Sequence, residues 1–338
     1  MNKIENGTYG KQAADFCNIP EKKQEIPVFF TIDDSYAPYL AVALTSLMEN
    51  ASSDYIYKIY VIYQELNEEN RGRISRMGRD GFDIELVPMQ KGLDDIRDRT
   101  ENRLRCDYFT LTIYFRLFLA DMFPQYDKGI YIDSDIVVPG DISKMFEIEL
   151  GDNIVGACPD FSIQEIPPLV NWVENAVGVP KAEYINSGVL LMNLKKMREV
   201  RLSKHFLGLL NRFHFDCLAP DQDYLNAMCH GKICYLPECW DVMPNKAKPP
   251  VEQPQLIHYN LYDKPWCYDD VMYEAYFWKY AWMTEYYDDI VRAKENYSEE
   301  QKQSDNECRN RMAEKGAVGD RPDVTFRKMY ERGEKIRV

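Results

Sequence analysis

The chain has 338 residues, 45% of them hydrophobic, which is enough to bury the core of one large α/β domain or of two modest ones. Its formal charge of -14 disfavours a general nucleic-acid binder, because the phosphate backbone requires a basic surface, and it disfavours broad adhesion to anionic lipid. No apolar run reaches about 18 residues and the N-terminus lacks a signal-peptide core, so the default compartment is the cytoplasm. The nine scattered cysteines, without any C-x-x-C pair, also predict a reduced protein.

Strands and helices alternate along the first part of the chain. Residues 1–25 are polar and uneven, and we expect them to form a loosely packed leader. Apolar runs bounded by turn residues predict three strands, at 26–32, 57–63 and 82–89. An amphipathic helix is predicted within 36–52, and a polar helix that opens on the capping residue Asn67 is predicted within 67–80. This alternation predicts parallel βαβ units with helices on both faces of a sheet.

Two aspartates then interrupt a run of apolar residues. In the segment KGIYIDSDIVV, Asp133 and Asp135 lie within a predicted strand that ends at Pro139. Successive side chains of a strand point to opposite faces, so these two carboxylates would lie side by side. Their repulsion would come on top of a desolvation cost of several kcal/mol per ion. The pair therefore predicts a bound cation or a strand end that is open to solvent.

The later elements are less regular. A mostly apolar helix is predicted at 111–123, and its single arginine, Arg116, needs a partner. Further strands are predicted in the segments NIVGACPD, INSGVLLMNL and ICYL. Cysteines 229, 234 and 239 are spaced poorly for zinc, so a reduced strand is favoured there. From residue 271 the chain is rich in aromatic and then charged residues, which predicts a C-terminal extension whose aromatic part covers the core.

Several polar residues follow predicted strands, where ligands gather in open α/β sheets. These residues are Asp33, Asp34, Asp133, Asp135, Asp160 and Asn186, and they are joined later by His258 and Lys264. Two carboxylates and a divalent metal sum to zero charge. A diphosphate adds about two negative charges, which Arg116 and Lys264 could cancel. The set suits a metal diphosphate.

Six segments occur in order along the chain: PVFFTIDDSYAPYL, LTIYFRLFLADMF, YIDSDIVV, YINSGVLLMNLKKMR, PDQDYLNAM and HYNLYDKPW. Together they resemble the retaining glycosyltransferases of family 8, which include bacterial lipooligosaccharide galactosyltransferases and glycogenin. The resemblance covers residues 26–270 and implies the GT-A fold, an α/β architecture in which helices flank a Rossmann-like mixed sheet. Residues 271–338 would then form a small helical extension, aromatic and charged.

The resemblance also implies a function. The chain would move a hexose, glucose or galactose, from a UDP-sugar to a glycan or lipid-linked acceptor, with retention of configuration, in cell-surface polysaccharide biosynthesis. Asp133, Asp135 and His258 would bind Mn²⁺, with Mg²⁺ as the alternative, because an imidazole among carboxylates suits manganese better. The donor nucleotide would contact Thr31, Asp33, Ser35, Tyr36, Arg116, Ser134 and Lys264. The sugar would be surrounded by Asp160, Asn186, Asp221 and Gln222.

One residue departs from the family pattern. The family usually has glycine where this chain has Leu261, and we expect leucine to alter that loop or to narrow the donor pocket. Gln222 is a poor nucleophile, so attack from the face that UDP leaves is favoured over a covalent intermediate. The segment Asp221-Gln222-Asp223 also reads as the first turn of a helix, since Pro220 precedes it.

Two other functions remain open at this stage. The segment DSDIV also fits the phosphatase motif of haloacid-dehalogenase-type enzymes, although that motif usually lies on the first strand. A nucleotide-sugar-binding protein without turnover is the second alternative. For either transferase or sensor, we expect no nucleic-acid partner and at most peripheral contact with the inner face of a membrane, through the net positive tail after Asp320.

Overall fold

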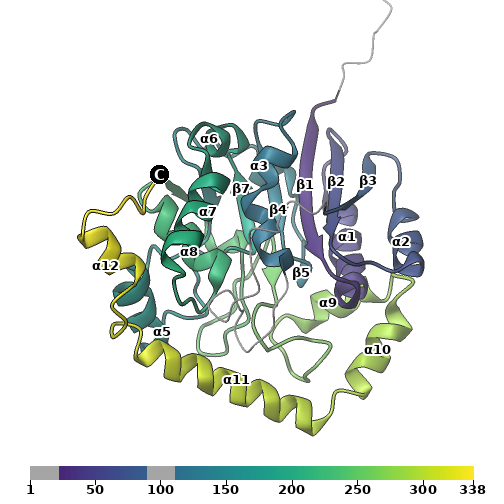
Figure 1. The fold of residues 1–338 in the computed structure, drawn as a ribbon. Helices are drawn as coiled ribbons and strands as arrows, with labels where there is room; N and C mark the ends of the chain where they lie inside the picture. Colours follow the sequence, from purple (N-terminus) through teal and green to yellow (C-terminus); the bar gives the residue numbers. More distant parts are fainter. Residues whose placement is uncertain (1–22, 90–110) are drawn as a thin grey trace, which may run out of the picture.

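The computed structural model describes residues 23–89 and 111–338. Within these residues the centre of the protein is a seven-stranded mixed sheet in the order β3-β2-β1-β4-β7-β6-β8, flanked by helices (Figure 1). A second sheet has two short strands, β5 and β9. Residues 1–22 of the predicted leader lie outside the described residues. The predicted α/β class, with a mixed sheet between helices, is confirmed.

The first half of the sheet is parallel, as predicted. β1 (Glu25–Ile32) pairs along its whole length with β2 (Ile56–Tyr63), which pairs with β3 (Phe82–Pro88). The crossovers contain α1 (Ala37–Asn50) and α2 (Glu68–Ser75). The side chain of Asn67 accepts a hydrogen bond from the backbone N–H of Asn70, which confirms the predicted cap of α2.

The second half of the sheet contains reversed strands. β4 (Gly129–Ile132) is parallel to β1, but β7 (Val189–Met192) is antiparallel to both β4 and β6 (Val155–Ala157). β8 (Ile233–Tyr235) is parallel to β6. The parallel βαβ pattern of the first half therefore does not extend to β7. The direction of an apolar strand such as VLLM cannot be inferred from its sequence.

The predicted strand through the acidic pair is broken. β4 ends at Ile132, residues 133–135 form a bend, and β5 (Ile136–Val137) pairs with β9 (Ile257–His258) in the second sheet. The prediction that both aspartates lie on one face of a single strand is therefore wrong. The break places both carboxylates at the carboxyl end of β4, where they line a cleft instead of lying within the apolar core.

The predicted helix at 111–123 is also interrupted. It consists of a 3-10 helix, Leu111–Leu117, followed by α3 (Leu119–Met122). Between them the backbone of Phe118 has φ -108 and ψ -7, and its N–H donates to the carbonyl of Phe115 in an i to i+3 bond. The β-branched and aromatic residues of this segment have modest α-helical propensity, so tertiary packing decides the geometry.

Helices cover the two faces of the sheet over two hydrophobic clusters. One cluster contains residues from α1, such as Leu40 and Leu44, and the other contains Phe206, Leu209 and Tyr224. The helices around the second cluster include α3, α6 (Leu194–Glu199), α7 (Leu202–Phe213) and α8 (Pro220–Cys229) (Figure 1). Shorter elements are the 3-10 helices Asp34–Tyr36 and Glu238–Trp240, α4 (Ser143–Phe146), α5 (Pro167–Asn171) and the π-helical turn Trp172–Val177.

The C-terminal part of the chain is helical and runs around the rim of the domain (Figure 1). It contains α9 (Glu274–Ala281), α10 (Tyr287–Glu295), α11 (Glu299–Ala317) and α12 (Phe326–Glu331). Phe277, Tyr280 and Tyr286 are buried, so the aromatic stretch covers the core as predicted, whereas Trp282 is 71% exposed.

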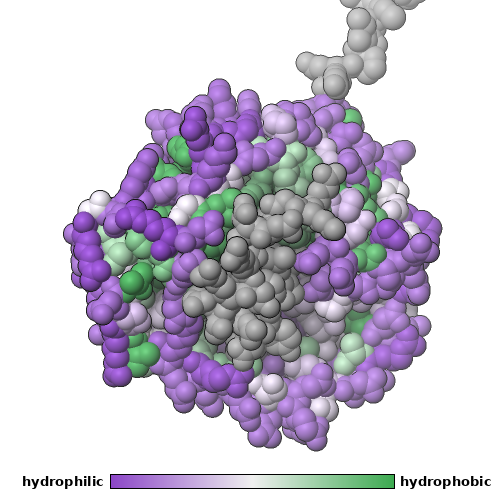
Figure 2. Space-filling model, viewed as in Figure 1, coloured by the Kyte–Doolittle hydropathy of each residue, from purple (hydrophilic) through white to green (hydrophobic). Residues whose placement is uncertain are grey.

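The surface is mainly polar. In Figure 2 hydrophilic residues cover most of the visible face, and hydrophobic residues lie in separate patches. Among the helices of the described ranges, none combines the length and the apolar character that crossing a bilayer requires.

Asp223 fastens α8 to the rest of the domain. Its buried carboxylate accepts hydrogen bonds from the indole N–H of Trp172 at 3.1 Å and from the hydroxyl of Tyr184 at 2.5 Å. The backbone N–H groups of Leu218 and Ala219 donate to it as well, at 2.9 and 3.3 Å. Burial raises the pKa of Asp223, although these hydrogen bonds oppose the shift. The acid therefore has a structural role.

We predict that Asp223→Asn lowers the free energy of unfolding by about 2–4 kcal/mol, because an amide N–H₂ would face donors where an acceptor is needed. Denaturant-induced unfolding measures this change. The control is Asp152→Asn, whose side chain is fully exposed and which we expect to be neutral within about 0.5 kcal/mol. Equal stability of the two variants would contradict the structural role of Asp223.

Candidate active site

A cleft of about 520 Å³ lies at the carboxyl ends of β1 and β4. Its walls include the predicted nucleotide residues, the predicted metal ligands and three of the four predicted sugar residues: Thr31, Asp33, Ser35, Tyr36, Arg116, Asp133, Ser134, Asp135, Asn186, Asp221, Gln222, His258 and Lys264. The fourth sugar residue, Asp160, is fully buried and does not line the cleft. The structure thus brings together residues that are up to 233 positions apart, from Thr31 to Lys264.

Three of these side chains could share a metal ion. One ligand atom each from Asp133, Asp135 and His258 lies within 4.8 Å of the others. The two acids come from the bend after β4, and His258 comes from β9, where it pairs with Ile136. Two carboxylates and one imidazole form a donor set that suits a borderline divalent ion such as Mn²⁺.

Cations surround the two acids. Oδ1 of Asp133 accepts hydrogen bonds from Arg116 Nη2 at 2.9 Å and from the Tyr131 hydroxyl at 2.6 Å. Asp135 accepts from Lys264 Nζ and lies 3.3 Å from His258 Nε2. Burial alone would raise the pKa of Asp135, but Lys264 and His258 hold it well below its usual range. Lys264 and His258 therefore favour the ionised form of Asp135, the form that a carboxylate needs to bind a metal.

A third carboxylate, not predicted from the sequence, lies behind the histidine. Oδ1 of the fully buried Asp241 is 3.1 Å from His258 Nδ1. Burial raises the pKa of Asp241 to about 6, against the opposing effect of His258. Burial lowers the pKa of His258, but Asp135 and Asp241 together raise it to about 10. Asp241 fixes the ring so that Nε2 points toward Asp135, an arrangement common among metal-binding histidines.

Gly188 makes room for two of the predicted metal ligands, His258 and Asp133, and its role was not predicted from the sequence. A Cβ at this position would lie 2.4 Å from Cε1 of His258 and 2.7 Å from Oδ2 of Asp133. The backbone N–H of Asp133 donates to the carbonyl of Gly188 at 2.8 Å, which fixes the two segments together. An isolated glycine at the start of a predicted strand is the signal that could have identified this close approach.

The predicted sugar residues form one hydrogen-bonded group. Oδ2 of Asp160 accepts from Gln222 Nε2 at 2.9 Å and from Asn186 Nδ2 at 3.4 Å. Ser187, which the sequence analysis missed, donates through its backbone N–H to Gln222 Oε1 at 3.1 Å and through its hydroxyl to Asp221 Oδ2 at 2.8 Å. Because Asp160 is buried beneath Gln222, it orients that amide rather than facing the cleft.

Arg116 links the two acidic groups. Its guanidinium is 4% exposed and pairs with Asp133 through Nη2 and with Asp221 through Nε, at 2.9 and 3.2 Å. Its Nη1 donates to the Ser187 carbonyl at 2.5 Å. Arg116 therefore has two acidic partners, where the sequence predicted a need for one. Through these pairs it connects the predicted metal ligands with the residues around Gln222.

The predicted nucleotide residues gather around the end of β1. Asp33 caps the following 3-10 helix by accepting from the backbone N–H of Ser35 at 2.9 Å and from that of Tyr36 at 3.2 Å. Thr31 and Tyr131 share a hydrogen bond between their hydroxyls at 2.8 Å. By contrast, Asp34 turns toward α2, where it accepts from Asn67. Asp33, rather than Asp34, therefore lines the cleft.

Leu261 has the backbone conformation of a glycine. Its φ of 59 lies in the left-handed region, which costs a residue other than glycine about 1–2 kcal/mol. The side chain lines the cleft. The loop therefore has, at Leu261, a backbone conformation that glycine favours, and Leu261 forms part of the pocket wall.

The cysteine cluster forms no metal site. Cys229 is buried in α8, and Cys234 and Cys239 are half-buried free thiols. Among the described residues, only Asp133, Asp135 and His258 form a metal-binding group of at least three such ligands. The strand predicted in the segment ICYL is confirmed as β8.

Comparison with known sequences identifies relatives. Residues 27–270 match the sequence model of glycosyl transferase family 8. A putative glycosyltransferase of Haemophilus influenzae is 26% identical over 221 residues, which cover 65% of this chain and 64% of that protein. A lipopolysaccharide 1,2-glucosyltransferase of Escherichia coli K12 is 24% identical over 258 residues, 71% of this chain and 72% of its own length.

Comparison with solved structures identifies the same fold. The galactosyltransferase LgtC, solved with donor and acceptor sugar analogues, matches with a TM-score of 0.65 at 26% identity over 82% of this chain and 100% of LgtC. The bifunctional glycosyltransferase WbbM has a TM-score of 0.68 at 21% identity, over 82% of this chain and 53% of WbbM. The predicted GT-A fold is confirmed by the likeness to LgtC.

We predict that Gly188→Ala weakens Mn²⁺ binding by about tenfold or more, because its Cβ would displace His258 or Asp133. Titration followed by electron paramagnetic resonance measures the affinity. Gly208→Ala in α7 is the matched control, since a Cβ there meets nothing within 4 Å. Unchanged Mn²⁺ affinity in a folded Gly188→Ala variant would show that the three ligands do not bind one ion.

A second prediction concerns the strained loop. Leu261→Gly removes the backbone strain of the folded state but increases the conformational entropy of the unfolded chain. Because these effects oppose each other, we expect the free energy of unfolding to stay within about 1 kcal/mol of the wild type. Leu261→Val keeps the left-handed backbone and adds a β-branch, which should cost about 1–2 kcal/mol. Thermal unfolding of both variants checks the order. A valine variant as stable as the wild type would rule out the strain.

Proposed function

The chain belongs to glycosyl transferase family 8, and from this premise we propose that it is a metal-dependent, retaining hexosyltransferase that uses a UDP-sugar. The observation that carries the proposal is the set of two acids and one imidazole, Asp133, Asp135 and His258, within one cleft beside Lys264 and Arg116. Such a set binds a divalent cation, and the two cations beside it match the charge of a diphosphate.

Each wall of the cleft has a part in donor binding. Asp133, Asp135 and His258 would hold Mn²⁺, with Mg²⁺ as the alternative, and the bound ion supplies Lewis-acid stabilisation of the departing UDP. Lys264 offsets part of the negative charge of the diphosphate. Arg116 offsets the negative charge of the two acids with which it pairs, Asp133 and Asp221. At the other end Asp33 accepts the N–H of uracil, Tyr36 stacks on the base, and Thr31, Ser35 and Ser134 line the remaining wall.

The sugar lies against the group formed by Asn186, Asp221 and Gln222. Asp221 is held by Arg116 and Ser187, and Gln222 is held by Asp160 and Ser187. The amide of Gln222 is a poor nucleophile, and the ion pair with Arg116 makes the carboxylate of Asp221 less nucleophilic. These residues therefore position the sugar while the acceptor attacks from the face that UDP leaves. A covalent glycosyl adduct on either residue would contradict this mechanism.

The donor is UDP-glucose or UDP-galactose, and the acceptor is a saccharide or a lipid-linked glycan used for cell-surface polysaccharide. The names of two relatives support these choices, a lipopolysaccharide 1,2-glucosyltransferase and a galactosyltransferase solved with donor and acceptor analogues. We propose that the protein acts in the cytoplasm, with at most peripheral contact with the inner face of a membrane. Within the basic tail, Arg327 and Lys328 already donate to groups of the protein, which limits the cations available to lipid.

Family membership argues against the phosphatase alternative, and the acidic pair follows β4 rather than the first strand. A binding protein without turnover is distinguished by assay. We expect the protein with Mn²⁺ to release UDP from one of a panel of UDP-sugars when a saccharide acceptor is present. Binding of UDP-sugars without any release of UDP would support the sensor instead.

We predict that Asp135→Asn lowers kcat/KM for the donor at least about 100-fold, because it removes a metal ligand and the partner of Lys264. Release of UDP measures the rate. Asp83→Asn is the control, since its side chain is 64% exposed and pairs with Lys58 on the surface. Full activity of Asp135→Asn, or activity insensitive to chelation of divalent ions, would overturn the role of the metal.

A further inference from the structure

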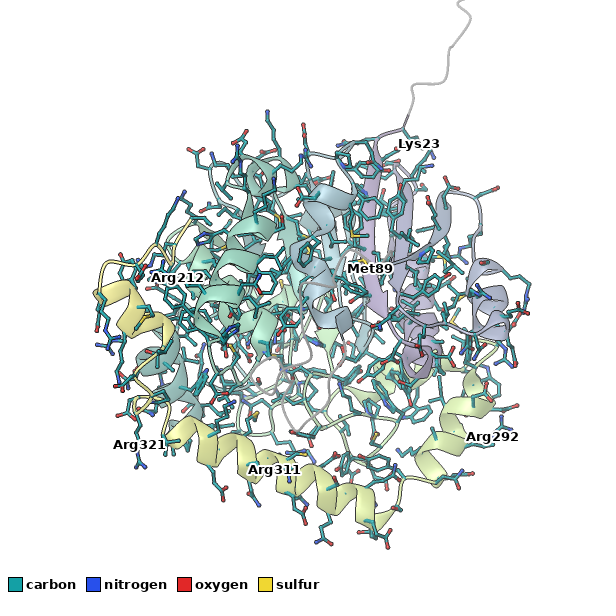
Figure 3. All side chains as sticks on the ribbon, viewed as in Figure 1. Lys23, Met89, Arg212, Arg292, Arg311 and Arg321 are labelled. Carbon is teal, nitrogen blue, oxygen red and sulfur yellow. The ribbon has the colours of Figure 1, made fainter. Side chains whose placement is uncertain are left out.

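The family match ends at residue 270, yet the chain that follows returns to the cleft. α11 passes along the edge of the domain in Figure 1, and in Figure 3 side chains fill the space between this helix, marked by Arg311, and the sheet. Tyr297 and Asp305 line the same cleft as the proposed metal ligands. Residues outside the matched region therefore form part of the cleft wall.

α11 is a firmly placed element. Its first turn has a capping box between Ser298 and Gln301. Near its other end, a Cβ on Gly316 would lie 2.6 Å from the carbonyl oxygen of Pro168, so the helix packs closely on α5. Asn171 also donates to the carbonyl of Gly316 at 2.9 Å. Because α11 is capped at its N-terminus and packed on α5 near its C-terminus, it can hold a segment that lies against its middle.

That segment is the loop 259–268, which carries Lys264. Oδ2 of Asp305 accepts hydrogen bonds from the hydroxyls of Tyr268 at 2.6 Å and Tyr297 at 2.7 Å. One turn further along α11, Arg309 pairs with Asp263 at 2.8 Å and its guanidinium lies 4.9 Å from the ring centre of Tyr262. Three residues of the loop, on both sides of Lys264, therefore bind to two residues of α11.

Contacts outside α11 also hold the loop in place. Leu261, at its start, has a strained left-handed backbone. Lys264 reaches the acidic pair by bonding to Asp135 and to the carbonyl of Tyr259. Trp266 stacks on Tyr39 with ring centres 4.0 Å apart, which fixes the far side of the loop. α11 contacts the loop before Lys264, at Tyr262 and Asp263, and again after it, at Tyr268.

We propose that α11 is a part of the donor site, in which Asp305 and Arg309 act as positioning residues that hold the Lys264 loop over the nucleotide diphosphate. This inference rests on the proposed UDP-sugar site and adds to it a requirement for the C-terminal helix. Without these contacts the loop must be ordered when the nucleotide binds, and that cost in conformational entropy appears as lost affinity.

The test compares a variant that removes the contacts between α11 and the loop with a variant that removes a different contact of α11. The double variant Asp305→Ala, Arg309→Met releases the loop. The control Lys315→Met removes another ion pair of the same helix, with Asp216. Arg309 and Lys315 have similar side-chain exposure, 39% and 34%, so loss of helix anchoring alone affects both variants. Isothermal titration calorimetry with UDP and Mn²⁺ measures Kd, and thermal unfolding confirms that each variant is folded.

We expect the double variant to raise Kd for UDP by about tenfold and to raise the donor KM alike, with the acceptor KM unchanged. The control should stay within about twofold of the wild type. If the double variant does not fold, Tyr268→Phe, which removes the hydrogen bond from the loop to Asp305, provides the measurement, with an expected rise of about threefold in Kd.

Two results would overturn the proposal, and they can be told apart. Wild-type affinity in a folded double variant, or equal weakening in the control, refutes the role of α11 and leaves the proposed function intact. If the wild-type protein itself binds no UDP in the presence of Mn²⁺, the proposed function fails and the inference fails with it.

Discussion

The acidic pair at the end of β4 is stable only because positive charge lies on both sides of it. Arg116 pairs with Asp133, and Lys264 pairs with Asp135. These cations come from the 3-10 helix before β4 and from the loop after β9, so the electrostatic requirement of two carboxylates draws distant segments together. A divalent ion with a diphosphate would add no net charge, so the same balance holds when the proposed ligands bind.

The mixed sheet determines which residues meet at this point. Because β7 runs antiparallel to β4, its first residue Val189 is paired with the last residue of β4, Ile132. The residues just outside this pair, Asp133 and Gly188, are joined by a backbone hydrogen bond. The segment before β7 thus places Asn186 and Ser187 next to the acids. If β7 were parallel to β4, these residues would lie at the opposite end of the strands.

Local patterns in the sequence were sufficient for the parallel strands and for most helices, whereas many of the residues that line the cleft were identified only through the resemblance to family 8. Local patterns were insufficient where the outcome depends on distant partners. The direction of β7, the bend at 133–135 and the role of Asp241 behind His258 all arise from pairings across long stretches of chain. A lone acid in the segment CWDVM carries no local sign of its histidine, since burial and the facing ring appear only after folding.

The loop that carries Lys264 has a strained backbone at Leu261 and contacts α11 on both sides of Lys264. Glycine at position 261 would adopt the left-handed backbone without strain, whereas leucine adopts it at a cost of about 1–2 kcal/mol. A strained conformation persists only when its surroundings determine it. Here Asp305 and Arg309 of α11 bind the loop on both sides of Lys264, and each contact opposes relaxation of the backbone at Leu261. Packing from α11, which lies outside the region that matches the family model, therefore helps to maintain the loop that contains Leu261.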